Sequence, residues 1–137
     1  MRVYGAGERA PQQNLTFKPV SQDEFLNDLA SSAALITTAG NQLVGEALYL
    51  RKPVLALPES GNYEQYINAH FLKEQGTGDW VEMEAVSPEV VRDFLQRVPE
   101  YAAKIDPKRV DGTRAAIQAI RCFIHKAAQR PPLAAAI

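Results

Sequence analysis

Cysteine is almost absent from this chain of 137 residues, which contains only Cys122. A disulfide framework is therefore excluded. Because Cys122 falls within the apolar periodicity of a late helical pattern, we expect a buried thiol in a reducing compartment, without a catalytic partner. Histidine is also scarce. His70 and His125 stand alone at helical positions, so we expect packing or surface roles for them and no metal site.

The sequence also lacks a charge excess and long apolar runs. Fifteen basic residues face sixteen acidic ones, and the net charge of -1 provides no basic surplus for binding nucleic acid. No apolar run approaches the roughly 18 residues needed to span a bilayer. The first ten residues lack the apolar core of a signal peptide. We therefore expect a cytoplasmic chain with no nucleic-acid partner and no membrane span.

The composition that remains is that of one globular domain. Hydrophobic residues make up 46% of the chain, which is long enough for a single core and too short for two ordinary ones. We expect this domain to cover residues 1–130. The remaining residues, 131–137, are expected to form a disordered tail.

Short apolar runs alternate with helical patterns along the domain, which is typical of βαβ units around a parallel sheet. Strands are expected at 2–5, 15–19, 34–38, 54–58 and 79–83. The runs at 34–38 and 54–58 are apolar on both faces, as expected for central strands that helices cover on each side. The sequence thus predicts an α/β fold, a Rossmann-like parallel sheet flanked by helices.

Helices are expected between these strands at 22–32, 41–51 and 63–75, and after the last strand at 88–98 and 113–129. Ser21 is expected to cap the first of them, with Glu24 at the capping-box position. Gly76 is expected to end the third, and Ser87 to cap the fourth. Pro99 should kink or break whatever follows the fourth helix, because a proline inside a helix removes one hydrogen bond and clashes with the preceding turn.

The connection between the first two strands, the turn-rich link at 5–14, is unusual because it contains no helical pattern. Parallel neighbours in one sheet usually need about a dozen connecting residues, most often a helix. Two alternatives follow. Either these strands are not simple parallel neighbours, or the link between them is irregular.

In an open α/β sheet, ligands bind outside the C-terminal ends of the strands. The strand at 34–38 ends in Thr38, and Ala39, Gly40 and Asn41 follow it, where a helix begins. Glycine allows a ligand to approach the backbone, and a helix N-terminus suits a phosphate. Glu46 leans back toward that N-terminus, since helical side chains do so. Its carboxylate suits a diol such as ribose, although an ordinary turn and a solvent-facing glutamate would look the same.

A second strand end brings Glu64 and Gln65 to the neighbouring edge of the sheet. Local helix chemistry alone could account for them. Asn62 is a good N-cap, Gln65 stands where its side chain can reach back to the N–H of the cap, and Glu64 lies in the favourable field of the helix N-terminus. An acid and an amide can equally hold sugar hydroxyls through directional hydrogen bonds. Both interpretations remain open at this point.

Several of these residues recur together in a known order. The pattern consists of Gly40, Glu46, Lys52 with Pro53, Pro58, Glu64 with Gln65, and Asn68 with Ala69. Residues 28–78 thereby resemble the nucleotide-sugar-binding C-terminal domain of GT-B glycosyltransferases. The most similar groups are the bacterial peptidoglycan lipid-linked N-acetylglucosaminyltransferases and the UDP-glucuronosyltransferase-like enzymes. The resemblance is strong over about 50 residues and fair over about 110.

The resemblance implies roles for the matching residues. Gly40 and its neighbours Thr38, Ala39 and Asn41 would face the diphosphate of the donor. Many relatives carry His or Arg at the position of Thr38, so here the backbone is expected to take over the phosphate contact.

Glu46 would hold the ribose hydroxyls, and Glu64 with Gln65 would hold the donor sugar, with Asn68 completing the motif. The donor would be a nucleotide diphosphate sugar, most simply a UDP-sugar. It would serve as the substrate, and no separate cofactor would be needed.

The resemblance also implies an enzyme that inverts, needs no metal and moves a hexosyl group. Such enzymes carry their acceptor site in an N-terminal domain, and the donor domain begins with a further strand–helix unit. By this comparison the chain is the donor-binding half of such an enzyme and is inactive alone. A missing N-terminal domain or partner subunit would complete it.

Two alternatives remain: a relative of the UDP-sugar 2-epimerases, which would need more catalytic acids, and a Rossmann-like interaction module. Apolar residues exposed on the last helix would favour the module.

Overall fold

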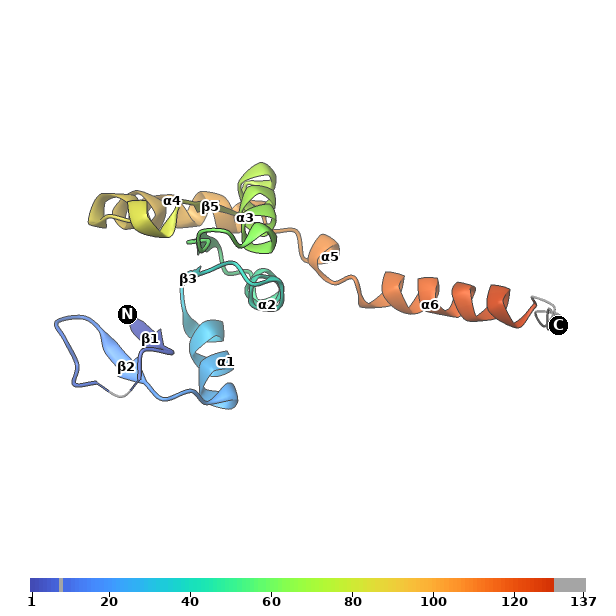
Figure 1. The fold of residues 1–137 in the computed structure, drawn as a ribbon, viewed down its shortest axis with the longest axis horizontal. Coiled ribbons are helices and arrows are strands. Elements are labelled where there is room, and N and C mark those ends of the chain that lie inside the picture. Colours follow the sequence, from blue (N-terminus) through green and yellow to red (C-terminus); the bar gives the residue numbers. More distant parts are fainter. Residues whose placement is uncertain (8, 130–137) are drawn as a thin grey trace.

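A computed structural model describes residues 1–7 and 9–129 (Figure 1). The expected tail at 131–137 lies outside these residues. The strands are β1 (Arg2–Tyr4), β2 (Thr16–Lys18), β3 (Leu35–Thr37), β4 (Val54–Ala56) and β5 (Gly78–Trp80). The helices are α1 (Gln22–Ser31), α2 (Asn41–Tyr49), α3 (Tyr63–Gln75), α4 (Pro88–Lys104), α5 (Pro107–Val110) and α6 (Thr113–Ala128), with a 3-10 turn, η1, at Met83–Ala85.

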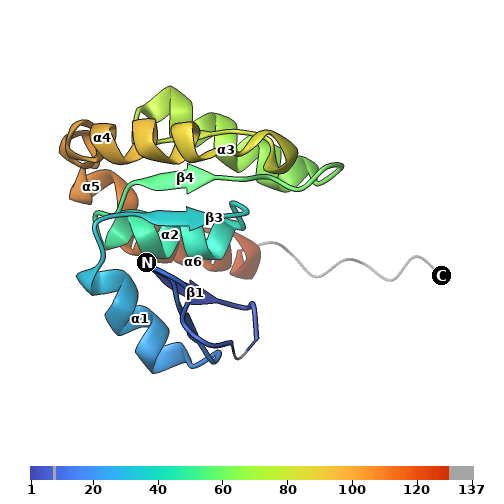
Figure 2. The same ribbon diagram turned by 90° about the vertical axis from the view of Figure 1, so that its left-hand side faces the viewer.

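The strands form two parallel sheets. The larger has the order β3-β4-β5, with Val54 of β4 paired to Leu35 on one side and to Gly78 on the other. The smaller contains β1 and β2 alone. Figure 2 shows β3 and β4 side by side and pointing the same way, with β1 apart from them. The predicted α/β fold of parallel strands flanked by helices is confirmed, although the strands are shorter than expected and fall into two groups.

The connection between β1 and β2 is irregular, which was the second of the two alternatives. Gly5, Gly7 and Gln13 all have positive φ angles, of 80°, 73° and 51°. Gln12 and Leu15 form an isolated antiparallel bridge just before β2. Left-handed turns of this kind reverse the chain twice within a few residues, so two parallel strands pair here without a crossover helix.

The core lies on both faces of β4. Val54 and Ala56 pack into a cluster on one face with residues of α2 and α3, and Leu55 packs with Phe94 and Tyr101 of α4 on the other. Every residue of β4 is buried, as its apolar sequence predicts. The expectation of a central strand at 34–38 was wrong. β3 is an edge strand of its sheet, so its residues are only partly buried.

Two predicted helix ends differ in the structure. Ser21 stands at the N-cap of α1, but its side chain makes no capping hydrogen bond. Glu24, which was expected to complete a capping box, has its carboxylate 3.5 Å from Lys18 Nζ. Pro99 neither breaks nor ends α4, which continues to Lys104. The carbonyl that Pro99 leaves unpaired belongs to Leu95, an exposed residue, so water can replace the lost bond.

Helix α6 extends away from the rest of the molecule (Figure 1). None of its residues is buried, and its large apolar side chains are 46–72% exposed. They are Ile117, Ile120, Phe123 and Ile124. The expectation of a buried thiol was therefore wrong, because Cys122 lies on this helix and is exposed. Apolar periodicity identified the helix correctly, but it does not reveal whether anything covers the apolar face.

Candidate functional site

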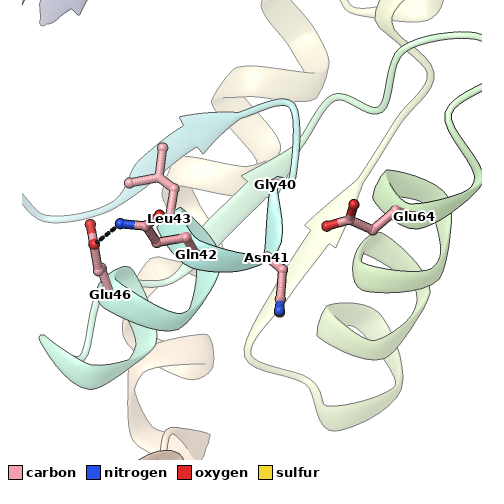
Figure 3. A pocket seen from close by; sticks show the side chains of 6 residues that line it. All are labelled: Gly40, Asn41, Gln42, Leu43, Glu46 and Glu64. Carbon is pink, nitrogen blue, oxygen red and sulfur yellow. Dashed lines mark hydrogen bonds between the residues drawn. The ribbon is translucent and has the colours of Figure 1, made fainter.

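An open pocket of about 530 Å³ lies at the C-terminal edge of the larger sheet, between the start of α2 and the start of α3 (Figure 3). Its lining residues are Gly40, Asn41, Gln42, Leu43, Glu46 and Glu64. Four of these were among the predicted donor-binding residues. The crevice expected beyond the strand ends is therefore present, and residues far apart in the sequence meet in it.

The first turn of α2 forms the middle of this pocket. Gly40 is the N-cap residue and, having no side chain, provides no cap. The first intrahelical hydrogen bond is that from the N–H of Val44 to the carbonyl of Gly40, at 3.1 Å. A helix supplies no acceptors for the N–H groups of its first turn. Those of Asn41, Gln42 and Leu43 consequently face the pocket edge together with the positive end of the helix dipole.

Neither the backbone nor packing requires glycine at position 40. Its φ of -58° is accessible to any residue, and a Cβ added there would meet no atom within 4 Å. The absent side chain would instead occupy open space beside the helix N-terminus. Glycine at this position therefore leaves room against the backbone, which is the property needed where a ligand contacts backbone N–H groups directly.

The residue before Gly40 is held in an unusual conformation. Ala39 is fully buried and has a φ of 70°, in the left-handed region. For a residue with a Cβ, this backbone conformation costs about 1–2 kcal/mol of conformational energy. The side-chain amide of Asn68 donates to the carbonyl of Ala39, at 2.9 Å. Thr38 is half-buried and does not line the pocket. The predicted residues Ala39 and Asn68 thus meet each other at the back of the turn.

Glu46 and Glu64 lie at opposite sides of the pocket, with the first turn of α2 between them (Figure 3). Glu46 points back along its helix, as predicted, and its carboxylate accepts a hydrogen bond from Gln42 Nε2 at 3.0 Å. None of the pocket's residues carries a positive side chain. Two carboxylates without a cation suit hydroxyl donors, and the helix end supplies partial positive charge at the pocket edge.

Gln65 points away from the pocket. Its Oε1 accepts the backbone N–H of Glu59 at 2.8 Å, and its Nε2 lies 3.4 Å from the carboxylate of the same residue. The predicted capping box is therefore only half formed. Asn62 does accept the N–H of Gln65, at 3.3 Å, but its own N–H bonds to the carbonyl of Glu59. Gln65 closes the loop between β4 and α3 instead of reaching back to the cap.

Two pocket residues were missed at the sequence level, namely Gln42 and Leu43. Gln42 stands four residues before Glu46, the spacing at which helical side chains meet, and that signal could have revealed it.

Within residues 1–7 and 9–129, no group of three or more His, Cys, Asp or Glu side chains is placed to hold a metal ion. No helix in the described part of the chain has the length and apolarity to cross a membrane.

Solved structures with the same fold include the glycotransferase of kitacinnamycin, with a TM-score of 0.68, 20% identity and 85% of this chain covered. The spinosyn forosaminyltransferase aligns with a TM-score of 0.69 and 18% identity over 82% of this chain. The chain covers 32% and 31% of these two proteins. At identities this low, the structural similarity shows the fold alone.

The sequence relatives also carry the name glycosyltransferase. An uncharacterized glycosyltransferase of Methanosarcina acetivorans is 30% identical over 102 residues, which are 72% of this chain and 27% of the relative. Another, from Methanosarcina mazei, is 33% identical over 96 residues, or 60% of this chain and 25% of the relative. The chain thus spans about a quarter of their length. Residues 1–99 match glycosyl transferase family 1, so the chain belongs to that family and has the fold of a GT-B glycosyltransferase C-terminal domain.

Proposed function

We propose that the pocket at the start of α2 binds the nucleotide diphosphate sugar donor of a glycosyltransferase, a UDP-sugar carrying a hexosyl group. The observation that carries this proposal is the order of chemistry along the pocket, in which the uncapped helix N-terminus lies between Glu46 and Glu64. A nucleotide diphosphate sugar has the same order, with ribose hydroxyls, an anionic diphosphate and sugar hydroxyls.

Each part of the donor then has a contact of suitable chemistry. The ribose diol donates to Glu46, and the diphosphate lies against the N–H groups next to Gly40. The sugar hydroxyls donate to Glu64. In transfer, charge builds on the leaving nucleoside diphosphate, and the positive end of α2 stabilises it without a metal ion. An acceptor-binding domain or subunit supplies the acceptor and the base, for a reaction that inverts the sugar carbon.

Calorimetric titration of the chain with UDP, UDP-N-acetylglucosamine, GDP and dTDP tests this proposal. We expect UDP-linked ligands to bind and Glu46→Ala to lower their affinity at least 10-fold, since a hydrogen bond to a charged group contributes about 1.5–3 kcal/mol. Glu74→Ala is the matched control, because Glu74 is an exposed glutamate of α3 outside the pocket. Absence of binding by every nucleotide would refute the proposal, and equal affinity in Glu46→Ala would refute the ribose assignment.

A second candidate function rests on the exposed face of α6. Ile120, Phe123 and Ile124 are 58%, 72% and 60% exposed. Solvent-exposed apolar side chains gathered on one helix are typical of a surface that another protein covers. In this proposal the chain is the donor-binding subunit or domain of a two-part enzyme, and α6 docks on the acceptor-binding part.

Polar substitution on α6 separates docking from folding. Ile120→Asp should leave the thermal midpoint of the chain unchanged, within about 2 °C, since exposed substitutions rarely alter stability by more than 0.5 kcal/mol. The uncovered apolar face should also make the isolated chain self-associate as its concentration rises, and Ile120→Asp should suppress this self-association, measured by light scattering. A large fall in the midpoint would mean that α6 belongs to the core of the chain, which would contradict the docking role.

A further inference from the structure

We propose that Asn68 is a positioning residue that holds the phosphate-facing turn in shape and makes no contact with the donor itself. The turn is Thr38–Gly40, between β3 and α2. The binding part of this inference rests on the proposed function, whereas its structural part does not. It also gives Asn68 a different role from the one that the family resemblance implies.

The bond that Asn68 makes spans the fold. Its amide nitrogen lies 2.9 Å from the carbonyl oxygen of Ala39, a residue 29 positions earlier in the chain. Ala39 is left-handed and fully buried, so its conformation persists only if its surroundings enforce it. The bond fixes the orientation of the peptide that joins Ala39 to Gly40. That orientation decides where the N–H of Gly40 points, at the entrance to the uncapped helix.

The position of Asn68 on α3 extends its effect to the other side of the pocket. Asn68 follows Glu64 by four residues, so the two share one face of the helix. Holding Asn68 against Ala39 therefore also sets how far Glu64 lies from the first turn of α2. One hydrogen bond thus fixes the distance between the diphosphate contact and the sugar contact, whereas Asn68 itself is not among the residues that line the pocket.

A double-mutant cycle between Asn68→Ala and Ala39→Gly tests the inference. Glycine adopts the left-handed conformation without strain, so the turn should depend less on Asn68 when residue 39 is glycine. Two properties are measured in all four proteins: the hydrogen-exchange rates of the Gly40 and Asn41 amides, and the affinities for UDP and UDP-N-acetylglucosamine. Gln75→Ala is the matched control, because it truncates an exposed amide of the same helix. Asn68→Leu, which keeps the volume and removes the donor, replaces Asn68→Ala if that variant does not fold.

We expect Asn68→Ala to speed amide exchange at Gly40 and Asn41 and to lower UDP affinity by about 5-fold, as expected for one lost hydrogen bond. In the Ala39→Gly background the same substitution should change both quantities by less than about 2-fold. Equal losses in both backgrounds would overturn the inference, as would a loss confined to UDP-sugars. If the wild type binds no UDP, the proposed function fails, and amide exchange alone still decides whether Asn68 holds the turn.

Discussion

Glu46 and Glu64 come from different helices and line one pocket from opposite sides of the first turn of α2 (Figure 3). No lysine or arginine is among the residues of that pocket. A ligand that fits both carboxylates brings hydrogen-bond donors such as hydroxyl groups to each of them, and an anionic group that it carries is most stable between them, at the helix end. This arrangement determines the first prediction.

Substitution of Glu64 should separate the sugar from the diphosphate. We expect Glu64→Ala to lower affinity for UDP-N-acetylglucosamine at least 10-fold, because hydrogen bonds to a carboxylate contribute about 1.5–3 kcal/mol. Affinity for UDP should stay within about 2-fold of the wild type, since UDP has no donor sugar to lose. Calorimetric titration of both ligands measures the difference. Parallel losses for the two ligands would show that Glu64 acts on the helix and not on the sugar.

A side chain at position 40 should affect binding and not folding. Because a Cβ there meets no atom and the backbone conformation is ordinary, Gly40→Ala should change the free energy of unfolding by less than about 1 kcal/mol. The added methyl group lies in the space where the diphosphate is proposed to contact the backbone, so UDP affinity should fall at least 10-fold. Urea denaturation and titration on the same preparation give both numbers. Destabilisation with unchanged affinity would contradict this account of Gly40.

The chain should lose stability in acid through Asp28. The hydroxyl of Tyr4 donates to its carboxylate at 2.6 Å and Lys18 Nζ lies 2.9 Å away, and these contacts lower the pKa of Asp28 below its ordinary value. A group with a lowered pKa stabilises the folded state fully above its unfolded pKa of about 3.9, and that stability disappears as pH falls through the folded pKa.

Urea denaturation followed by circular dichroism between pH 2 and pH 7 measures this effect. The difference in stability between wild type and Asp28→Asn should be constant from pH 5 to pH 7, and it should shrink below about pH 4. A difference that is independent of pH throughout would exclude Asp28 as the acid-sensitive group. The stabilising contacts lie between β1, β2 and α1, so the loss should appear there first.

Gly78 should tolerate no side chain. A Cβ at this position would collide with the backbone carbonyl of Val54 in the paired strand β4, and a backbone atom in a central strand has no room to move. Gly78→Ala should therefore destabilise the chain by about 3 kcal/mol, at the upper end for overpacking. Gly45→Ala is the matched control, because a Cβ in the helix there meets nothing and should stabilise by about 0.5–1 kcal/mol. Thermal unfolding compares the two.

Local patterns predicted local structure well. The start of α3 at Asn62 and its end at Gly76 both follow from capping chemistry that involves only neighbouring residues, and the structure confirms both. The capping role of Gln65 was wrong for a non-local reason. The loop after β4 folds back and presents the backbone N–H of Glu59, which competes with the cap for the side chain. Periodicity and spacing contain no information about that loop.

Pairing between distant segments could not be predicted from the sequence either. The division of the strands into two sheets depends on which edges meet, and each strand on its own is a run of only three residues. The continuation of α4 through Pro99 depends on the packing of Phe94 and Tyr101. Helix propensity rules do not include such tertiary contacts. The meeting of Gly40, Glu46 and Glu64 could be expected, because carboxyl ends of parallel strands share one edge.

Helix α1 joins the two sheets through adjacent residues. Asp28 is held by side chains of β1 and β2, whereas Leu29 inserts into the cluster around β4. Two units joined in this way need not melt together, and a single transition would require α1 to transmit cooperativity between them. The only tryptophan, Trp80, lies in β5. Its fluorescence therefore reports the melting of the sheet that carries the pocket, and far-ultraviolet circular dichroism adds the smaller sheet and α1 as a second probe.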